Sequence, residues 1–180
     1  MMKFFFKISA FILLFVSFSS AQTQIQKIAD ISLAPVSTFK NFCSRCHGDE
    51  GSAYGKTFGK LKDDSLRTIT EDMMFGPGGL NPSKIEVNVM ADYNKSLYDK
   101  KPFGTVLNLK SFVDGKEKTL KIESSPGTEL TLDNESIKIE KKNDLWELNF
   151  DPSKIKQFKI SFIRNGFTSF LKYPDEICTE

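Results

Sequence analysis

Residues 87–112 read VNVMADYNKSLYDKKPFGTVLNLKSF, and the pattern of the sequence changes within this stretch. Before Asp99 the apolar residues recur about every fourth position, as at Tyr93 and Leu97, which is the spacing of one face of a helix. After Pro102 apolar and polar residues alternate, which is the spacing of a strand with one buried face. Charged residues and proline interrupt helical periodicity, so the sequence predicts a domain boundary at 99–102.

The alternating pattern continues through the C-terminal part of the chain and is broken by turn sequences such as Asp133-Asn134 and Asn165-Gly166. About seven short strands are predicted, over 105–112, 117–124, 129–132, 136–140, 145–150, 157–163 and 167–171. Short antiparallel strands in this number are typical of a small sandwich. We therefore expect residues 102–180 to form an antiparallel β-sandwich.

The segment before the boundary predicts three helices. The first covers 38–46 after a cap at Ser37, and the second covers 64–74. The third is capped by Asn81, has Pro82 in its first turn and ends near Tyr98. Residues 36–101 are therefore expected to form a small all-α domain, and the fold class is an α + β protein of two domains.

The N-terminus has the pattern of a secretory signal peptide. Lys3 and Lys7 precede the short apolar run ISAFILLFV, and small residues at Ser19-Ser20-Ala21 supply a cleavage site. We assign 1–21 to the signal peptide and 22–35 to a lead-in segment. The apolar run is shorter than the roughly 20 residues that span a bilayer, and no later run approaches that length. We expect a periplasmic or otherwise exported protein without stable membrane insertion.

Composition and charge narrow the class of partner. With 39% apolar and 27% charged residues the chain reads as a folded protein and not as a disordered one. Removing Lys3 and Lys7 from the 25 basic side chains leaves as many as the 23 acidic ones. Because affinity for a phosphate backbone depends on neutralising cations, we expect no nucleic-acid partner.

Cys43-Ser44-Arg45-Cys46-His47 is a CxxCH sequence, the pattern for covalent attachment of c-type haem. Cysteines three positions apart project from one face of a helix, where both sulfurs can meet the vinyl groups of one porphyrin. The adjacent imidazole of His47 is the candidate for the proximal iron ligand. His47 is the only histidine, so the sixth ligand cannot be a second one.

A thioether sulfur is the usual alternative sixth ligand. The candidates downstream of the signal peptide are Met73, Met74 and Met90. Met90 ranks third, because a methionine within the apolar stripe of a helix more often fills a gap in a core.

CxxC also occurs in disulfides and redox dithiols, both of which suit an exported protein. A four-ligand zinc site would need two more cysteines or histidines, and only Cys178 is left. A thioredoxin-like dithiol would follow a strand, whereas a helix is predicted around Cys43. The following His47 favours haem over these alternatives.

The haem-attachment pattern and the glycines after it resemble the class I cytochrome c family over roughly residues 36–98. The residues that carry this resemblance are Cys43, Cys46, His47, Gly48, Gly51 and Gly55. In that family the axial methionine lies in a loop shortly before a capped final helix. The resemblance implies Met74 as the distal iron ligand, with Met73 as the alternative.

The sequence therefore predicts a monohaem c-type cytochrome that transfers single electrons through one covalently bound haem c and its iron. It would act as a carrier, or as the haem-bearing subunit of a periplasmic redox complex, and not as an enzyme by itself. Redox proteins are the expected partners, and the C-terminal domain is a candidate for docking to a larger complex. Candidates to line the haem pocket are the apolar residues Phe39, Phe42, Tyr54, Phe58, Leu61, Ile69 and Leu80.

Two alternatives stay open. An open sixth position on the iron would favour a haem-based sensor or a gas-binding protein. A simple disulfide between Cys43 and Cys46 would favour an adhesion or binding module without haem.

Overall fold

The computed structural model describes residues 33–108, 118–143 and 145–174. The predicted signal peptide, most of the lead-in segment and Cys178 lie outside the described residues.

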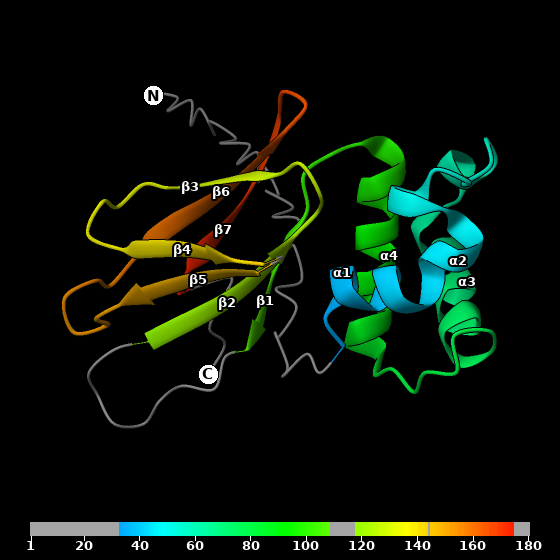
Figure 1. The fold of residues 1–180 in the computed structure, drawn as a ribbon, viewed down its shortest axis with the longest axis horizontal. Coiled ribbons are helices and arrows are strands. Elements are labelled where there is room, and N and C mark those ends of the chain that lie inside the picture. Colours follow the sequence, from blue (N-terminus) through cyan, green and yellow to red (C-terminus); the bar gives the residue numbers. More distant parts are fainter. Residues whose placement is uncertain (1–32, 109–117, 144, 175–180) are drawn as a thin grey trace, which may run out of the picture.

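Helices occupy the N-terminal part of the described chain (Figure 1). Three short elements run on from one another without a break and carry the CxxCH sequence: α1 (Pro35–Thr38), the π-helical turn η1 (Phe39–Cys43) and α2 (Ser44–His47). Two 3₁₀ turns follow, η2 (Asp49–Gly51) and η3 (Phe58–Lys60), and then the two longer helices, α3 (Asp63–Phe75) and α4 (Lys84–Asp99).

The ends of the two longer helices follow from local sequence. Asp63 and Asp64 place negative charge in the first turn of α3, where the helix dipole favours it. Ser83 and Glu86 form a capping box at the start of α4: the Ser83 side chain accepts from the Glu86 N–H, and the Glu86 carboxylate accepts from the Ser83 N–H. Lys100, in the left-handed conformation, ends α4.

The described residues contain seven strands in two antiparallel sheets. The four-stranded sheet has the order β1 (Gly104–Asn108), β2 (Lys118–Ser124), β5 (Leu145–Phe150) and β4 (Lys138–Lys142). The three-stranded sheet has the order β3 (Glu129–Leu132), β6 (Phe158–Arg164) and β7 (Phe167–Tyr173). Asn165 and Gly166 join β6 to β7 with positive φ angles, as a two-residue hairpin requires. We call β1 to β7 together the β domain.

One hydrophobic core holds the two sheets together. It takes Ile122 and Leu148 from the four-stranded sheet and Ile160 and Phe162 from the other, all 1% exposed or less. Because side chains of both sheets interdigitate in one core, we treat the β domain as a single rigid frame. A second, smaller core lies among the helices and includes Tyr93, and the side chain of Phe103 from the linker packs against it.

The predicted fold class, an all-α cytochrome c-like domain followed by an antiparallel β-sandwich, is wrong. Within the described residues the regular structure is mostly a small β domain, and there only α3, with 13 residues, and α4, with 16, are helices of ordinary length. The CxxCH segment is divided into pieces of four or five residues, and it is tied to the β domain through Glu123. Helical periodicity in the sequence located the helices, but it does not reveal such buried contacts to a distant strand.

Two predicted helix starts are also wrong. The first helix begins at Pro35, so Ser37 lies inside it, where its hydroxyl donates to Glu123. The last helix is capped by Ser83 and not by Asn81. In the part of the chain that the structure describes, no helix has the length and apolar character needed to cross a membrane.

Candidate functional site

The CxxCH residues lie at the C-terminal end of one helical run, 35–47, which we call the motif helix. Cys43 ends η1, and Cys46 and His47 close α2. Both thiols are free, with Cys43 half-buried and Cys46 exposed. Gly48 ends the run at φ 71°, a conformation that glycine adopts without strain.

A tight loop follows His47 and turns the chain back on it. Glu50 and Gly51 have positive φ angles of 53° and 72°. The Ala53 N–H donates to the His47 carbonyl at 2.8 Å. The ring of Tyr54 therefore lies against the imidazole of His47, with ring centroids 5.0 Å apart.

A pocket of about 90 Å³ opens between the motif helix, α3 and α4. It is smaller than the roughly 300 to 1,000 Å³ of typical small-molecule and cofactor sites, so it could enclose only part of a large cofactor. We call it the motif pocket, and it is lined by Cys43, His47, Tyr54, Phe58, Leu66, Ile69, Thr70, Met73, Met74, Met90 and Asn94. The structure thus brings Cys43 and His47 together with all three candidate methionines, although Cys46 is not among the lining residues.

The three methionines differ in their surroundings. Met74, near the end of α3, is 2% exposed, and Met90 on α4 is 1% exposed. Met73 is 46% exposed. Two backbone hydrogen bonds fix the turn after α3, from Gly78 N–H to the Met73 carbonyl at 2.9 Å and from Leu80 N–H to the Met74 carbonyl at 2.8 Å. Burial therefore separates Met73 from the other two but does not separate Met74 from Met90.

Some of the predicted pocket residues line the motif pocket and others do not. Tyr54, Phe58 and Ile69 line it. Four predicted residues do not line the motif pocket: Phe39, Phe42, Leu61 and Leu80. Of these, Phe39 is buried in the helical core and Phe42 is 47% exposed.

Three lining residues were not predicted: Leu66, Thr70 and Asn94. Leu66 precedes the predicted Ile69 by about one helical turn, Thr70 precedes Met74 by one turn, and Asn94 follows Met90 by one turn, so helical spacing from the predicted residues could have found them.

Polar side chains interrupt the apolar wall of the motif pocket at two places. Thr70 is 4% exposed. The Oδ1 atom of Asn94 is buried and has no hydrogen-bond partner within the described structure. A buried polar atom without a protein partner is costly, so we expect a water molecule or a bound ligand to donate to it.

The pocket also suppresses ionisation. Burial raises the pKa of the Cys43 thiol, and the nearby Cys46 raises it further. Burial likewise raises the pKa of the Tyr54 hydroxyl, with smaller contributions from Cys43 and Tyr93. Both shifts have the direction that burial in a low-dielectric site produces.

The donor set fits a covalently attached haem. Cys43 and Cys46 supply the two thiols, His47 an imidazole and Met74 or its neighbours a thioether, and the remaining wall is mostly apolar. Two lining side chains, Ile69 and Met73, are 40% and 46% exposed, so the rim leaves apolar surface for a large planar group to cover. Among the described residues no group of three or more His, Cys, Asp or Glu side chains is placed to hold a metal ion.

Comparison with known proteins gave no match among protein families, curated proteins or solved structures.

Proposed function

We propose that this chain is an exported monohaem c-type cytochrome, which transfers single electrons through haem c held by Cys43 and Cys46. The observation that carries the proposal is the motif pocket, in which Cys43, His47 and three methionines lie together. The resemblance of the CxxCH region to class I cytochromes c supports the same conclusion.

Each residue has a separate task in this proposal. Cys43 and Cys46 would anchor the group through thioether bonds, and His47 would supply an imidazole nitrogen to its iron. When bound, haem c supplies an iron that accepts and releases one electron. The apolar wall, with Leu66 and Phe58, limits the access of water, which lowers the cost of reorganisation when charge changes.

Met74 is the proposed distal ligand, with Met73 as the alternative. Met74 is buried, and the hydrogen bond from Leu80 N–H fixes its backbone at the end of α3. A soft, neutral thioether at this position would favour ferrous iron and so raise the reduction potential.

We propose a periplasmic or otherwise exported location and other redox proteins as partners. The chain would pass electrons between them as a carrier or as the haem-bearing subunit of a complex. No substrate bond is broken in this scheme.

One observation favours a second candidate function, haem-based sensing or gas binding. Thr70 and the unpartnered Asn94 place polar groups in the motif pocket, where they could hydrogen-bond a small ligand on an open sixth position.

The optical spectrum separates these functions. The full chain is expressed in a host that attaches haem c, with Cys43→Ser/Cys46→Ser as the matched control. Sharp low-spin bands on reduction, with no response to carbon monoxide, support the electron carrier. A high-spin spectrum that shifts with carbon monoxide supports the sensor, and the absence of haem bands in the unsubstituted chain refutes both.

A further inference from the structure

We propose that the β domain holds the motif helix at both ends and so sets the position of His47 relative to the methionines. Glu123 acts at the start of the helix, and Arg164 acts just beyond its end. Both are positioning residues and neither touches the motif pocket. The inference assigns a role to the β domain and, for its haem readout, rests on the proposed function.

The Glu123 carboxylate of β2 accepts hydrogen bonds from the first turn of the motif helix. Its Oε2 accepts from the Val36 N–H at 2.8 Å. Its Oε1 accepts from the Ser37 hydroxyl at 2.8 Å and from the Ser37 N–H at 3.4 Å. The first N–H groups of a helix have no partner within the helix, and the dipole favours negative charge there. The Glu123 carboxylate, which belongs to β2, therefore provides hydrogen-bond acceptors for the N–H groups at the start of the motif helix.

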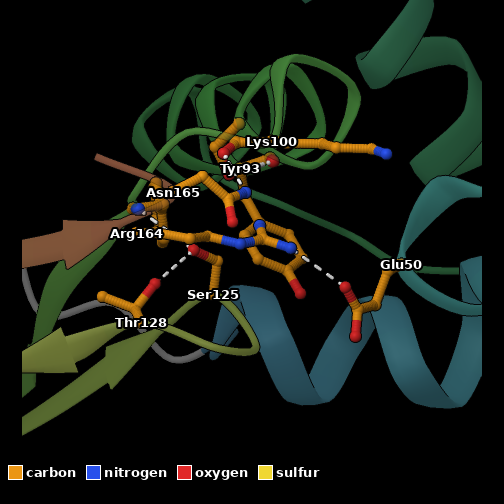
Figure 2. Close-up of polar contacts among 9 residues, drawn as sticks. Glu50, Tyr93, Lys100, Ser125, Thr128, Arg164 and Asn165 are labelled. Carbon is orange, nitrogen blue, oxygen red and sulfur yellow. Dashed lines mark hydrogen bonds and ion pairs between the residues drawn. The ribbon is translucent and has the colours of Figure 1, made fainter. Parts of the chain in front are cut away.

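Arg164, the last residue of β6, reaches the loop that follows the other end of the motif helix. Its guanidinium donates from Nη2 to Oε2 of Glu50 at 3.0 Å (Figure 2). Glu50 lies three residues after His47, in the loop whose Ala53 N–H binds the His47 carbonyl. The next residue, Asn165, donates from Nδ2 to the carbonyl of Lys100, which ends α4. The β6–β7 hairpin thus contacts both the His47 loop and the helix that carries Met90.

The burial of the two charges argues for a positional role. Glu123 is 0% exposed, and the side chain of Arg164 is 9% exposed. Burying charge is expensive, and apolar residues of similar volume would often stabilise a fold at least as well. Charge in these places instead supplies directional contacts, which fix where the helix begins and where its following loop lies.

The contacts of Glu123 and Arg164 lie at opposite ends of the motif helix. At 1.5 Å per residue, its thirteen residues cover about 20 Å. Glu123 belongs to the four-stranded sheet and Arg164 to the three-stranded sheet, and the two sheets share one core. Because the frame is rigid, loss of either contact lets one end of the motif helix move, and His47 shifts against Met74 on α3.

The test compares Glu123→Gln and Arg164→Gln with two controls at exposed positions of the same sheets, Glu140→Gln on β4 and Lys159→Gln on β6. Each haem-loaded protein is titrated for its reduction potential. We expect the two positioning variants to change the equilibrium constant for reduction about tenfold, which is 59 mV for one electron. The controls should change it less than twofold.

A charge swap separates position from charge and from loss of folding. Glu50 is 51% exposed, so Glu50→Arg is compatible with folding. Glu50→Arg combined with Arg164→Glu keeps the net charge and restores an ion pair. The swap should recover the original potential, whereas each single substitution should not. The proposal is overturned if the reduction potential of the variants depends only on their net charge. It is also overturned if the double substitution does not restore the original reduction potential.

Hydrogen exchange gives a readout that does not depend on haem. In Glu123→Gln the amides of Val36 and Ser37 should exchange at least tenfold faster, while those of β5 keep their protection. If the protein shows no haem bands but the amides of Val36 and Ser37 exchange faster, the positioning role is supported and the proposed function is refuted. If these amides are unchanged, or if every amide accelerates equally, the positioning role is refuted.

Discussion

Replacement of Met74 by leucine removes a sulfur from the motif pocket and leaves its volume nearly unchanged. Met74 is 2% exposed and lines the pocket with His47. Met90→Leu is the matched control, because Met90 is 1% exposed and lines the same pocket from α4. Both substitutions exchange a thioether for a branched hydrocarbon in a buried site, so only a role in ligation should distinguish them.

The expected effects on stability are small and similar. A volume-conserving swap of Met for Leu in a core usually costs less than about 1.5 kcal/mol. Truncation of Met74 to alanine would cost about 2 to 5 kcal/mol and would mix packing with ligation. Denaturant unfolding of the two Leu variants should therefore give free energies within about 1.5 kcal/mol of the unsubstituted chain.

The expected effects on the haem are different. Met74→Leu should abolish the near-infrared band from methionine to ferric iron, lower the reduction potential and open the iron to carbon monoxide. Met90→Leu should leave the band in place. The reasoning is refuted if Met90→Leu removes the band while Met74→Leu keeps it, and the alternative ligand is established if only Met73→Leu removes it.

Three further predictions concern packing and charge. Gly104→Ala should lower the free energy of unfolding by about 1 to 3 kcal/mol, because the added Cβ would overlap the ring of Phe162. Phe162→Ala should lower it by about 3 to 5 kcal/mol, since this 1% exposed ring lies in the core between the sheets; denaturant titration checks both. Partial desolvation raises the pKa of Asp92 above its ordinary 3.8, against the opposing effect of Arg67, but the residue is exposed and solvent screens the effect. Asp92→Asn should therefore increase stability at pH 7 by no more than about 0.5 kcal/mol, and this gain should disappear as the pH falls below 3.8, as unfolding at a series of pH values would show.

Local periodicity located most of the secondary structure. The helix predicted over 64–74 is confirmed as Asp63–Phe75, and the strand predicted over 145–150 is confirmed as Leu145–Phe150. Both segments have apolar residues at a clear spacing, which burial on one face produces. Helix starts were predicted less well, because Ser83 and Asn81 are both good caps and the sequence does not show which one meets a suitable partner.

The fold class could not be predicted in the same way. Glu123 falls in a strand with apolar neighbours at alternate positions, so its period-two pattern suggests an outward, solvated carboxylate. In the structure it is buried against Val36, which is 87 residues away in sequence. Contacts of this kind join the helices to the β domain, and neither spacing nor propensity encodes them.

The candidate site was partly predictable. Short-range spacing predicted Cys43 and His47 as candidates and the family resemblance predicted Met74; the structure brings the three to one pocket, and their roles stay predictions. Asn94 was missed, since a lone amide on a helix reads as a solvated side chain. Its buried, unpartnered Oδ1 becomes visible only when α4 is packed against the motif helix.

The central claim is the covalent attachment of one haem to Cys43 and Cys46. Its most direct test is the intact mass of the purified protein, measured under denaturing conditions after expression in a host that attaches haem c. The account predicts the mass of the chain from Gln22 plus one haem, and the bare polypeptide mass for Cys43→Ser/Cys46→Ser. The bare polypeptide mass for the unsubstituted chain would contradict it.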